Sequence, residues 1–190
     1  TQSDDLYHVT SQHMHIRRLT PEDASAFRTL RLAALLDEPT AFGASYEEES
    51  ALAPEVLASR LAQHSDRGVF GAFDDDTLVG LVALAREDKL KLRHKGMIFG
   101  MYVAPEARGK SIGRKLLAHA LALAESAPGL LQVNLSVNTN NPAAISLYES
   151  LGFQTFGREP GAMKIGNALY DELHMCWHPN EANPSCLRCL

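Results

Sequence analysis

The clearest pattern along the chain is a series of short apolar or alternating segments that are typical of β-strands. Residues 69–73 and 78–85 are apolar runs on either side of Asp74-Asp75-Asp76-Thr77, a polar turn that predicts a hairpin. Residues 130–137 alternate as a strand does, and further strands are predicted at residues 15–19, 97–103, 153–157 and 168–177.

Apolar residues spaced three and four positions apart predict the helices. Thr20-Pro21-Glu22-Asp23 opens the first helix, with Thr20 as its N-cap and Pro21 at the first helical position, and we expect the helix to stop before Pro39. Further helices are predicted at residues 54–64, 109–126 and 142–150. The acidic segment 41–50 and the basic segment 86–96 are predicted to be loops.

The order of these elements defines a fold class. One strand, two helices, three strands, a helix, a strand, a helix and two strands favour a single α/β domain, a mixed central sheet flanked by helices. A length of 190 residues also suits one domain. We expect residues 1–13 to be a leader ahead of a natural start at Met14, residues 14–178 to form the domain, and residues 179–190 to be a C-terminal tail.

Composition narrows the classes of function. The chain carries 18 Lys and Arg against 23 Asp and Glu, and this net charge of −5 disfavours general nucleic-acid binding because no excess of cations can displace counterions. The sequence has neither an apolar run of membrane-spanning length nor a secretory signal, so we expect a cytoplasmic protein that does not bind membranes. Cys186-x-x-Cys189, with Cys176 the only other cysteine, is at most half of a zinc site, so no metal is expected.

The most informative segment runs from Ala104 to Arg114, where a strand ends and a basic loop with glycines leads directly into a helix. Unpaired backbone N–H groups at a helix N-terminus favour anions, and glycines let the backbone approach a bulky one closely. The glycine spacing matches neither a P-loop nor a dinucleotide fingerprint. The segment therefore predicts a pyrophosphate cradle made by Arg108, Gly109, Lys110, Ser111, Ile112, Gly113 and Arg114.

A second motif spans residues 140–153. Asn141 is placed to cap a helix that has Pro142 at its first position, and Gly152 is placed to end it. Together the two motifs resemble the GNAT family of N-acetyltransferases: Arg108-x-x-Ser111-x-Gly113 is similar to its pyrophosphate signature, with Ser111 where glycine is usual. The second motif resembles the family's Asn-x-x-Ala-x-x-Leu-Tyr block, with matches that include Asn141, Ala144 and Tyr148.

The resemblance implies an acyl-CoA N-acyltransferase fold and acetyl-CoA as the co-substrate, with an amine as the acceptor. It implies that strand 97–103 bulges and splays from strand 130–137, so that pantetheine lies in the gap against Met101, Tyr102 and Val103 and touches Asn141 and Ala144. Tyr148 would protonate the leaving sulfur after direct attack by the amine. Residues 30–35, 39–42 and 170–173 resemble a bacterial subgroup whose acceptor is undefined.

The general base stays open at this point, because strand 97–103 contains no carboxylate and has Gly100 where one is most expected. The candidates are Glu47, Glu48, His94, Asp171 and Glu172, with a water chain as the alternative. Phe42, Tyr46 and Tyr102 are candidates for the lining of the acceptor pocket.

Three functions compete. The first is acetylation of a small-molecule or peptide amine, the second is acetylation of protein N-termini, and the third is a non-catalytic acyl-CoA sensor that has lost its base. A homodimer is also left open.

Overall fold

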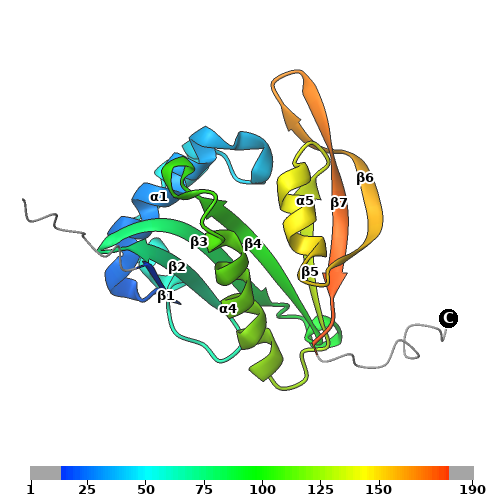
Figure 1. Cartoon of the computed structure of the whole chain (residues 1–190), viewed down its shortest axis with the longest axis horizontal. Helices are drawn as coiled ribbons and strands as arrows, with labels where there is room; N and C mark the ends of the chain where they lie inside the picture. Colours follow the sequence, from blue (N-terminus) through cyan, green and yellow to red (C-terminus); the bar gives the residue numbers. More distant parts are fainter. Residues whose placement is uncertain (1–13, 180–190) are drawn as a thin grey trace, which may run out of the picture.

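The computed structural model describes residues 14–179, which form a mixed seven-stranded sheet in the order β1-β2-β3-β4-β5-β7-β6 (Figure 1). Every neighbouring pair is antiparallel except β4 and β5, which run parallel. The strands are Met14–Arg18 (β1), Gly68–Asp74 (β2), Thr77–Arg86 (β3), Lys95–Val103 (β4), Gln132–Asn138 (β5), Gln154–Ile165 (β6) and Ala168–Trp177 (β7). The mixed α/β fold expected from the order of elements is confirmed.

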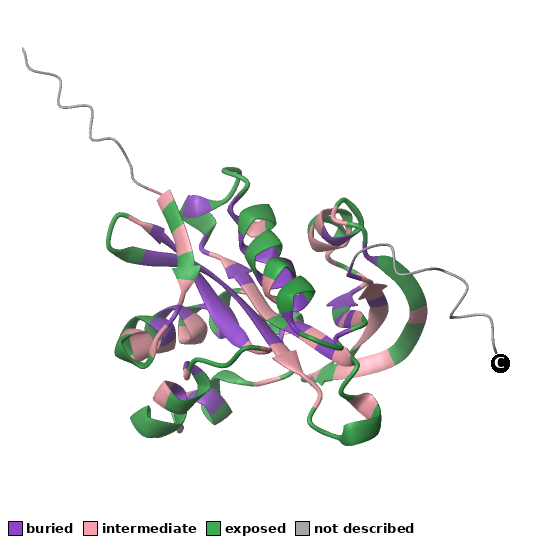
Figure 2. Ribbon diagram, turned by 90° about the horizontal axis from the view of Figure 1, so that it is seen from below, coloured by how far each residue is buried: buried purple, intermediate pink, exposed green. Residues whose placement is uncertain are grey.

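Helices cover both faces of the sheet (Figures 1 and 2). On one face lie α4 and α5, and on the other lie α1, α2 and α3. The α-helices are Ala24–Asp37 (α1), Tyr46–Ser50 (α2), Pro54–Arg60 (α3), Ile112–Ser126 (α4) and Pro142–Glu149 (α5). Short 3-10 turns precede α1, α2, β4 and α4 at Pro21–Asp23, Pro39–Ala41, Leu90–Leu92 and Pro105–Ala107.

The core sits on both faces of the central strands, where buried side chains concentrate (Figure 2). β3 is buried from Leu78 to Leu84 without alternation, because α1 packs on one of its faces and α4 on the other. From α4, Leu116, Leu117 and Ala120 are fully buried at helical spacing. This packing makes β2, β3 and β4 a rigid support for the loop between β4 and α4.

The prediction of a loop over residues 41–50 is wrong. Residues 46–50 form α2, which begins at a capping box where Ser45 Oγ accepts from the Glu48 N–H and Glu48 Oε2 accepts from the Ser45 N–H. The acidic run that indicated a solvated loop instead occupies the first turn of a helix, where carboxylates are favourable.

Strand β6 is longer than the predicted strand at residues 153–157 and extends to Ile165. Pro160 and Gly161 (φ +63°) lie where its register with β7 shifts between Glu159 and Met163, and edge strands tolerate both residues at such irregularities. Two helices are shorter than predicted: α4 begins at Ile112, after the loop, and α3 ends at Arg60.

Several expectations fall on the ends of the chain. The predicted leader, Cys186, Cys189 and nearly all of the predicted tail lie outside the described residues. Within residues 14–179, no three or more His, Cys, Asp or Glu side chains gather as a metal site would require. No helix in the same range is long and apolar enough to cross a membrane.

Candidate active site

The site is built around an opening between β4 and β5. These parallel strands pair only from Lys95 and Gln132 to Met97 and Asn134, and they diverge beyond that point. The pairing of β3 with β4 also shifts register between Leu81 and Ala83, at a bulge whose Gly100 adopts φ +65°. Glycine takes this left-handed conformation without steric cost, which explains why the strand can bulge here. The expected splay and bulge are thus present.

A groove of about 520 Å³ runs between α4 and α5 on one side of this opening. It brings together every cofactor-binding residue predicted from the sequence except Lys110 and Tyr148. Those lining it are Met101, Tyr102, Val103, Arg108, Gly109, Ser111, Ile112, Gly113, Arg114, Asn141 and Ala144. The two motifs, separate in the sequence, therefore form the two walls of one groove.

The loop into α4 has the backbone that an anion cradle needs. Gly109 adopts φ +81° and Ser111, the N-cap of α4, adopts φ +58°, so the backbone turns sharply before the first helical turn. The N–H groups of that turn have no partner within the helix and favour an anion. At Gly113, a Cβ would lie 3.0 Å from Met101 Cε and 3.2 Å from Leu147 Cδ2, so glycine keeps the wall of the groove open.

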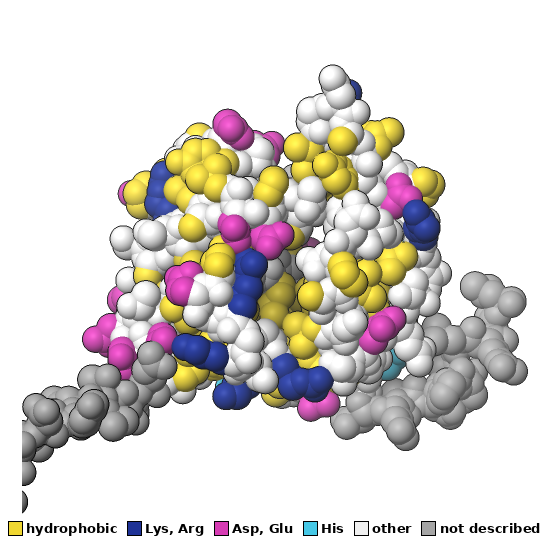
Figure 3. Space-filling model, turned by 45° about the horizontal axis from the view of Figure 1, so that its top comes forward, with side chains coloured by type: hydrophobic (Ala, Val, Ile, Leu, Met, Phe, Trp, Pro, Cys, Tyr) yellow, Lys and Arg dark blue, Asp and Glu magenta, His cyan; other side chains and the backbone are white. Residues whose placement is uncertain are grey.

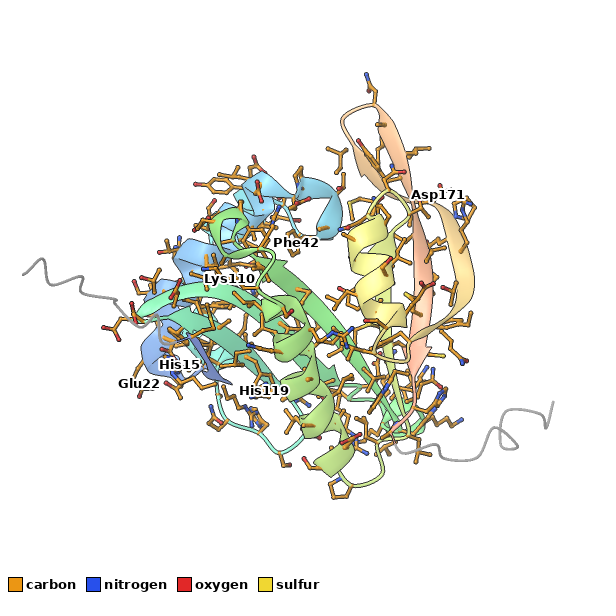
Figure 4. The ribbon with its side chains drawn as sticks, in the orientation of Figure 1. His15, Glu22, Phe42, Lys110, His119 and Asp171 are labelled. Carbon is orange, nitrogen blue, oxygen red and sulfur yellow. The ribbon has the colours of Figure 1, made fainter. Side chains whose placement is uncertain are left out.

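Two of the predicted basic residues are engaged elsewhere. The Arg108 Nη2 atom lies 2.8 Å from Asp37 Oδ2 and 3.3 Å from Glu38 Oε1, and its Nε donates to the Val103 carbonyl. Its charge is therefore largely balanced by α1. The Lys110 ammonium lies 3.8 Å from Asp74 on β2 and does not line the groove (Figure 4).

A central cavity of about 400 Å³ continues the groove into the opening. Met101, Asn141 and Ala144 line both spaces, so the two are continuous. The surface is visibly hollowed between the two halves of the molecule, with charged side chains at the margin (Figure 3). Of the aromatic residues proposed for an acceptor pocket, Phe42 lines the central cavity and Tyr102 the groove, whereas Tyr46 lines neither.

Tyr148 reaches the central cavity from α5. It is 6% exposed, and its ring packs edge-on against Phe153 with centroids 5.9 Å apart. Burial raises the pKa of its phenol to about 12, so the hydroxyl is protonated near neutral pH and available as a donor. Asn141 caps α5 by accepting from the Ala144 N–H, as predicted, and this cap fixes the start of the helix that carries Tyr148.

The structure separates the five candidates for the general base. Only Glu172 lines the central cavity. Glu48 is committed to the cap of α2, and Glu47 lies exposed beside it. Asp171 lies on the β6–β7 hairpin (Figure 4), where a backbone bond from Gly161 and an ion pair with Arg158 lower its pKa. His94, which precedes β4, lines none of the three cavities described for residues 14–179.

A hydrogen-bonded chain that sequence reasoning missed borders the same cavity. Ser136 of β5 lines it, and Ser136 Oγ lies 2.9 Å from His174 Nδ1 on β7. His174 Nε2 lies 3.0 Å from Glu159 Oε2 on β6. The three residues are far apart in the sequence and meet only through strand register, so no local motif could have signalled them.

Comparisons with known proteins agree with this geometry. The model of the family described as "Acetyltransferase (GNAT) family" matches residues 30–153. A mycothiol acetyltransferase from Brachybacterium faecium is 31% identical over 139 residues, which is 72% of this chain and 39% of that protein. A peptidyl-lysine N-acetyltransferase from Salmonella typhimurium is 36% identical over 85 residues, which is 45% of this chain and 48% of that protein. The chain thus spans less than half the length of either relative.

Solved structures share the fold. An acetyltransferase of the GNAT family from Streptococcus pneumoniae superposes with a TM-score of 0.78 at 23% identity, over 87% of this chain and 99% of that one. An acetyltransferase from Salmonella typhimurium, solved with acetyl-CoA, gives a TM-score of 0.73 at 22% identity over 90% of this chain and 97% of that one. The chain belongs to the GNAT acetyltransferase family.

Proposed function

We propose that the protein transfers an acetyl group from acetyl-CoA to a primary amine by direct attack. The observation that carries this proposal is the continuity of the groove between α4 and α5 with the central cavity that contains Tyr148. The groove fits the fold's co-substrate: it offers free N–H groups at the start of α4 and has space at Gly113 that a Cβ would fill. The cavity supplies polar groups where the thioester would end.

In this mechanism the pyrophosphate binds the first turn of α4, with Arg114 at the rim of the groove. Pantetheine passes Asn141 and Ala144 and runs along the part of β4 that lacks a strand partner on the β5 side. A backbone N–H at Met101, next to the bulge, polarises the thioester carbonyl. The Val103 carbonyl already accepts from Arg108 Nε, so Met101 carries more of the pantetheine contact than Val103 does.

The chemical step forms a C–N bond and breaks a C–S bond. The neutral amine attacks the carbonyl carbon, the carbonyl electron pair moves to oxygen, and collapse of the intermediate expels the thiolate. The Tyr148 phenol, with its pKa of about 12, is a weaker acid than a thiol of pKa about 8.5. Its main contribution is therefore a hydrogen bond to the developing thiolate. The thiolate then takes a proton from solvent to give the free thiol, and the base that received the amine proton returns it to solvent.

We assign the amine proton to the chain that begins at Ser136. The proton passes to Ser136 Oγ as the Ser136 hydroxyl proton moves to His174 Nδ1, and Glu159 accepts from the Nε2–H and stabilises the charged imidazole. This arrangement requires the neutral Nε2–H tautomer of His174 before reaction. The Ser136–His174–Glu159 chain would thus take the role of the carboxylate expected on β4, where Gly100 stands.

The experiment must distinguish this function from two alternatives, a non-catalytic sensor and an acetyltransferase of protein N-termini. A sensor without catalytic activity needs the groove but gains nothing from Tyr148 and the Ser136 chain in the central cavity. Acetylation of protein N-termini needs room for a polypeptide. The similar proteins reported above are named as a mycothiol acetyltransferase and a peptidyl-lysine N-acetyltransferase, so relatives at this level of identity differ in their acceptors. A cytoplasmic location and a homodimer stay predictions from the sequence.

The test is release of free thiol from acetyl-CoA with a panel of amines that includes amino acids, polyamines and peptides. We expect turnover with at least one amine, and a lower kcat in both Ser136→Ala and His174→Gln with unchanged affinity for acetyl-CoA. Glu172→Gln tests the competing base, because Glu172 lines the same cavity outside the chain. An unchanged kcat in this variant supports the Ser136 chain, whereas a lower kcat here with an unchanged kcat in Ser136→Ala would assign the amine proton to Glu172. Tight binding of acetyl-CoA without turnover of any amine would support the sensor instead.

A further inference from the structure

A third cavity, of about 430 Å³, lies on the α1–α3 face of the sheet, opposite the groove. Its floor consists of β3 side chains, and its walls include Arg31 of α1, Glu49 of α2 and Arg60 of α3. Arg31, Phe99 and Gly100 line both this cavity and the central cavity, so the two spaces meet at the β4 bulge. The third cavity therefore adjoins the opening between β4 and β5.

The charges that line this cavity are mainly positive, although the whole chain carries −5. Arg31, Arg60 and Arg67 stand against the single carboxylate of Glu49, so the lining has a surplus of two positive charges, three minus one. Arg67 also pairs with Asp88 at 2.7 Å and lies 3.6 Å from Asp66, both outside the lining. Arg31 and Arg60 have Glu49 as their shared carboxylate partner.

The hydrogen bonds of this cluster are incomplete. Glu49 is 7% exposed and binds Arg60 Nη1 through both of its oxygens, at 3.0 and 3.1 Å. It lies 3.6 Å from Arg31 Nη2. Arg31 Nη1 is buried and has no hydrogen-bond partner within residues 14–179. Arg67 Nε also lacks a hydrogen bond, but it lies 3.6 Å from Asp66 Oδ1 in an ion pair. Buried guanidinium N–H groups are normally paired, so the unpaired Arg31 Nη1 beside this cavity points to a ligand that accepts hydrogen bonds.

We propose that the third cavity binds a carboxylate of the acceptor, so that the substrate is a small amine of the amino-acid type. The inference rests on the proposed acetyl transfer and narrows its substrate class. A carboxylate matches the planar fork of a guanidinium and is the common biological anion joined to a primary amine. The cavity volume lies within the range of about 300–1,000 Å³ that is usual for small-molecule sites.

The geometry orients such a substrate. With its carboxylate at Arg31, its amine points through the passage beside Gly100 toward the opening between β4 and β5. A Cβ built at Gly100 meets no atom within 4 Å, so the passage there is clear. The ring of Phe42, 4.7 Å below the Arg31 guanidinium, holds Arg31 in place by a cation–π contact. A polyamine would bring a second positive charge toward the arginines and is disfavoured.

The test compares matched acceptors in the thiol-release assay. Each amino acid is paired with its carboxamide, which has the same shape but no charge, and 2-aminoethyl phosphate is paired with ethanolamine to separate carboxylate from phosphate. We expect kcat/KM for the carboxylates to exceed that for the carboxamides by about 10- to 100-fold, the range for a charge-assisted hydrogen bond. Arg31→Gln should bring this ratio close to one, and Arg17→Gln, an exposed arginine on β1, should leave it unchanged.

Binding provides a readout that does not depend on turnover. N-acetylated amino acids should bind the wild-type protein more tightly than the corresponding amides in calorimetry, and Arg31→Gln should remove the difference. If Arg31→Gln does not fold, Arg67→Gln takes its place, because Arg67 also lines the third cavity. Equal kcat/KM for carboxylates, carboxamides and polyamines would overturn the inference, as would a clear preference for the phosphate. No turnover of any amine would count against acetyl transfer itself, and the binding arm would still decide the carboxylate site.

Discussion

At the residue scale, Tyr148 is both part of the hydrophobic core and the proposed hydrogen-bond donor to the leaving sulfur. Its ring belongs to the core beside Phe153, and the residue also lines the central cavity. Phenylalanine keeps the ring, so Tyr148→Phe should fold normally and bind acetyl-CoA with nearly unchanged affinity. It should lower kcat by about 10- to 100-fold, the effect of losing one hydrogen bond to a charged sulfur, and not by more, because a thiol leaves fairly well unassisted. An unchanged kcat in the folded variant would remove Tyr148 from the mechanism.

A substitution at Gly113 tests whether the loop into α4 binds the pyrophosphate of acetyl-CoA. Gly113→Glu places bulk and negative charge where anions bind, so acetyl-CoA affinity should be largely lost. The nearest atoms to the added Cβ are the flexible ends of Met101 and Leu147, so the fold should survive. The control is Ala118→Glu on the exposed side of α4. Calorimetry that finds near-normal acetyl-CoA affinity in the folded Gly113 variant would place the cradle elsewhere.

At the scale of elements, the start of α4 carries a small backbone strain. Ser111 adopts φ +58°, a conformation that costs L-residues about 1–2 kcal/mol and glycine almost nothing. After the extra chain entropy of glycine is subtracted, Ser111→Gly should stabilise the fold by about 0.5–1 kcal/mol. Urea unfolding measures this, with Ser126→Gly at the helical end of α4 as a control of opposite sign. A lower urea midpoint for Ser111→Gly than for the wild type would show that Ser111 does not strain the backbone.

The stabilisation that the Arg17–Asp23 ion pair gives to the connection from β1 to α1 depends on pH. A hydrogen bond from Arg17 lowers the pKa of Asp23 to about 2, against about 3.9 in an unfolded chain. Because the folded pKa is the lower one, the stabilisation is complete above about pH 4 and is lost as the pH falls through 2.

Asp23→Asn should therefore cost stability at pH 7 and progressively less in acid. The cost is about 1 kcal/mol, because the Arg17 side chain is 43% exposed and solvent screens the pair. Urea midpoints from pH 7 to pH 2 for wild type and variant measure it, and Glu125→Gln, an exposed carboxyl on α4, serves as the control. A difference that persists undiminished at pH 2 would contradict the assignment to this ion pair.

At the scale of the whole molecule, the groove joins two motifs on different elements, so its ligand should stabilise the complete fold. Acetyl-CoA at 100 times its dissociation constant should add about 2.7 kcal/mol to the free energy of unfolding if it binds only the folded state. NAD and ATP should add much less, because the loop matches neither of their glycine patterns. A thermal melt raised by either nucleotide and not by acetyl-CoA would exclude the groove as a coenzyme A site.

Much of the fold and part of the site follow from local sequence alone. Alternating and helical spacing located the strands and most helices, because each pattern reflects which side of one element is buried. The loop from Arg108 to Gly113 and the cap at Asn141 were also predictable, since a few adjacent residues determine a turn or a cap. The short helix α2 was missed because its capping box lies in an acidic run that also suits a loop.

Only the tertiary structure decided which charges face one another. Arg108, predicted as a phosphate ligand, lines the groove, and its pairing with Asp37 of α1, 71 positions away, could not be predicted. The Ser136–His174–Glu159 chain depends on the register of three strands, and the incomplete pairing around Arg31 depends on how α1 packs over the sheet. Such contacts join distant segments, whereas sequence patterns report only on neighbours along the chain. The loop into α4 can therefore be predicted from the sequence alone, whereas the proposed proton path and the proposed acceptor cavity depend on contacts that form only when the chain folds.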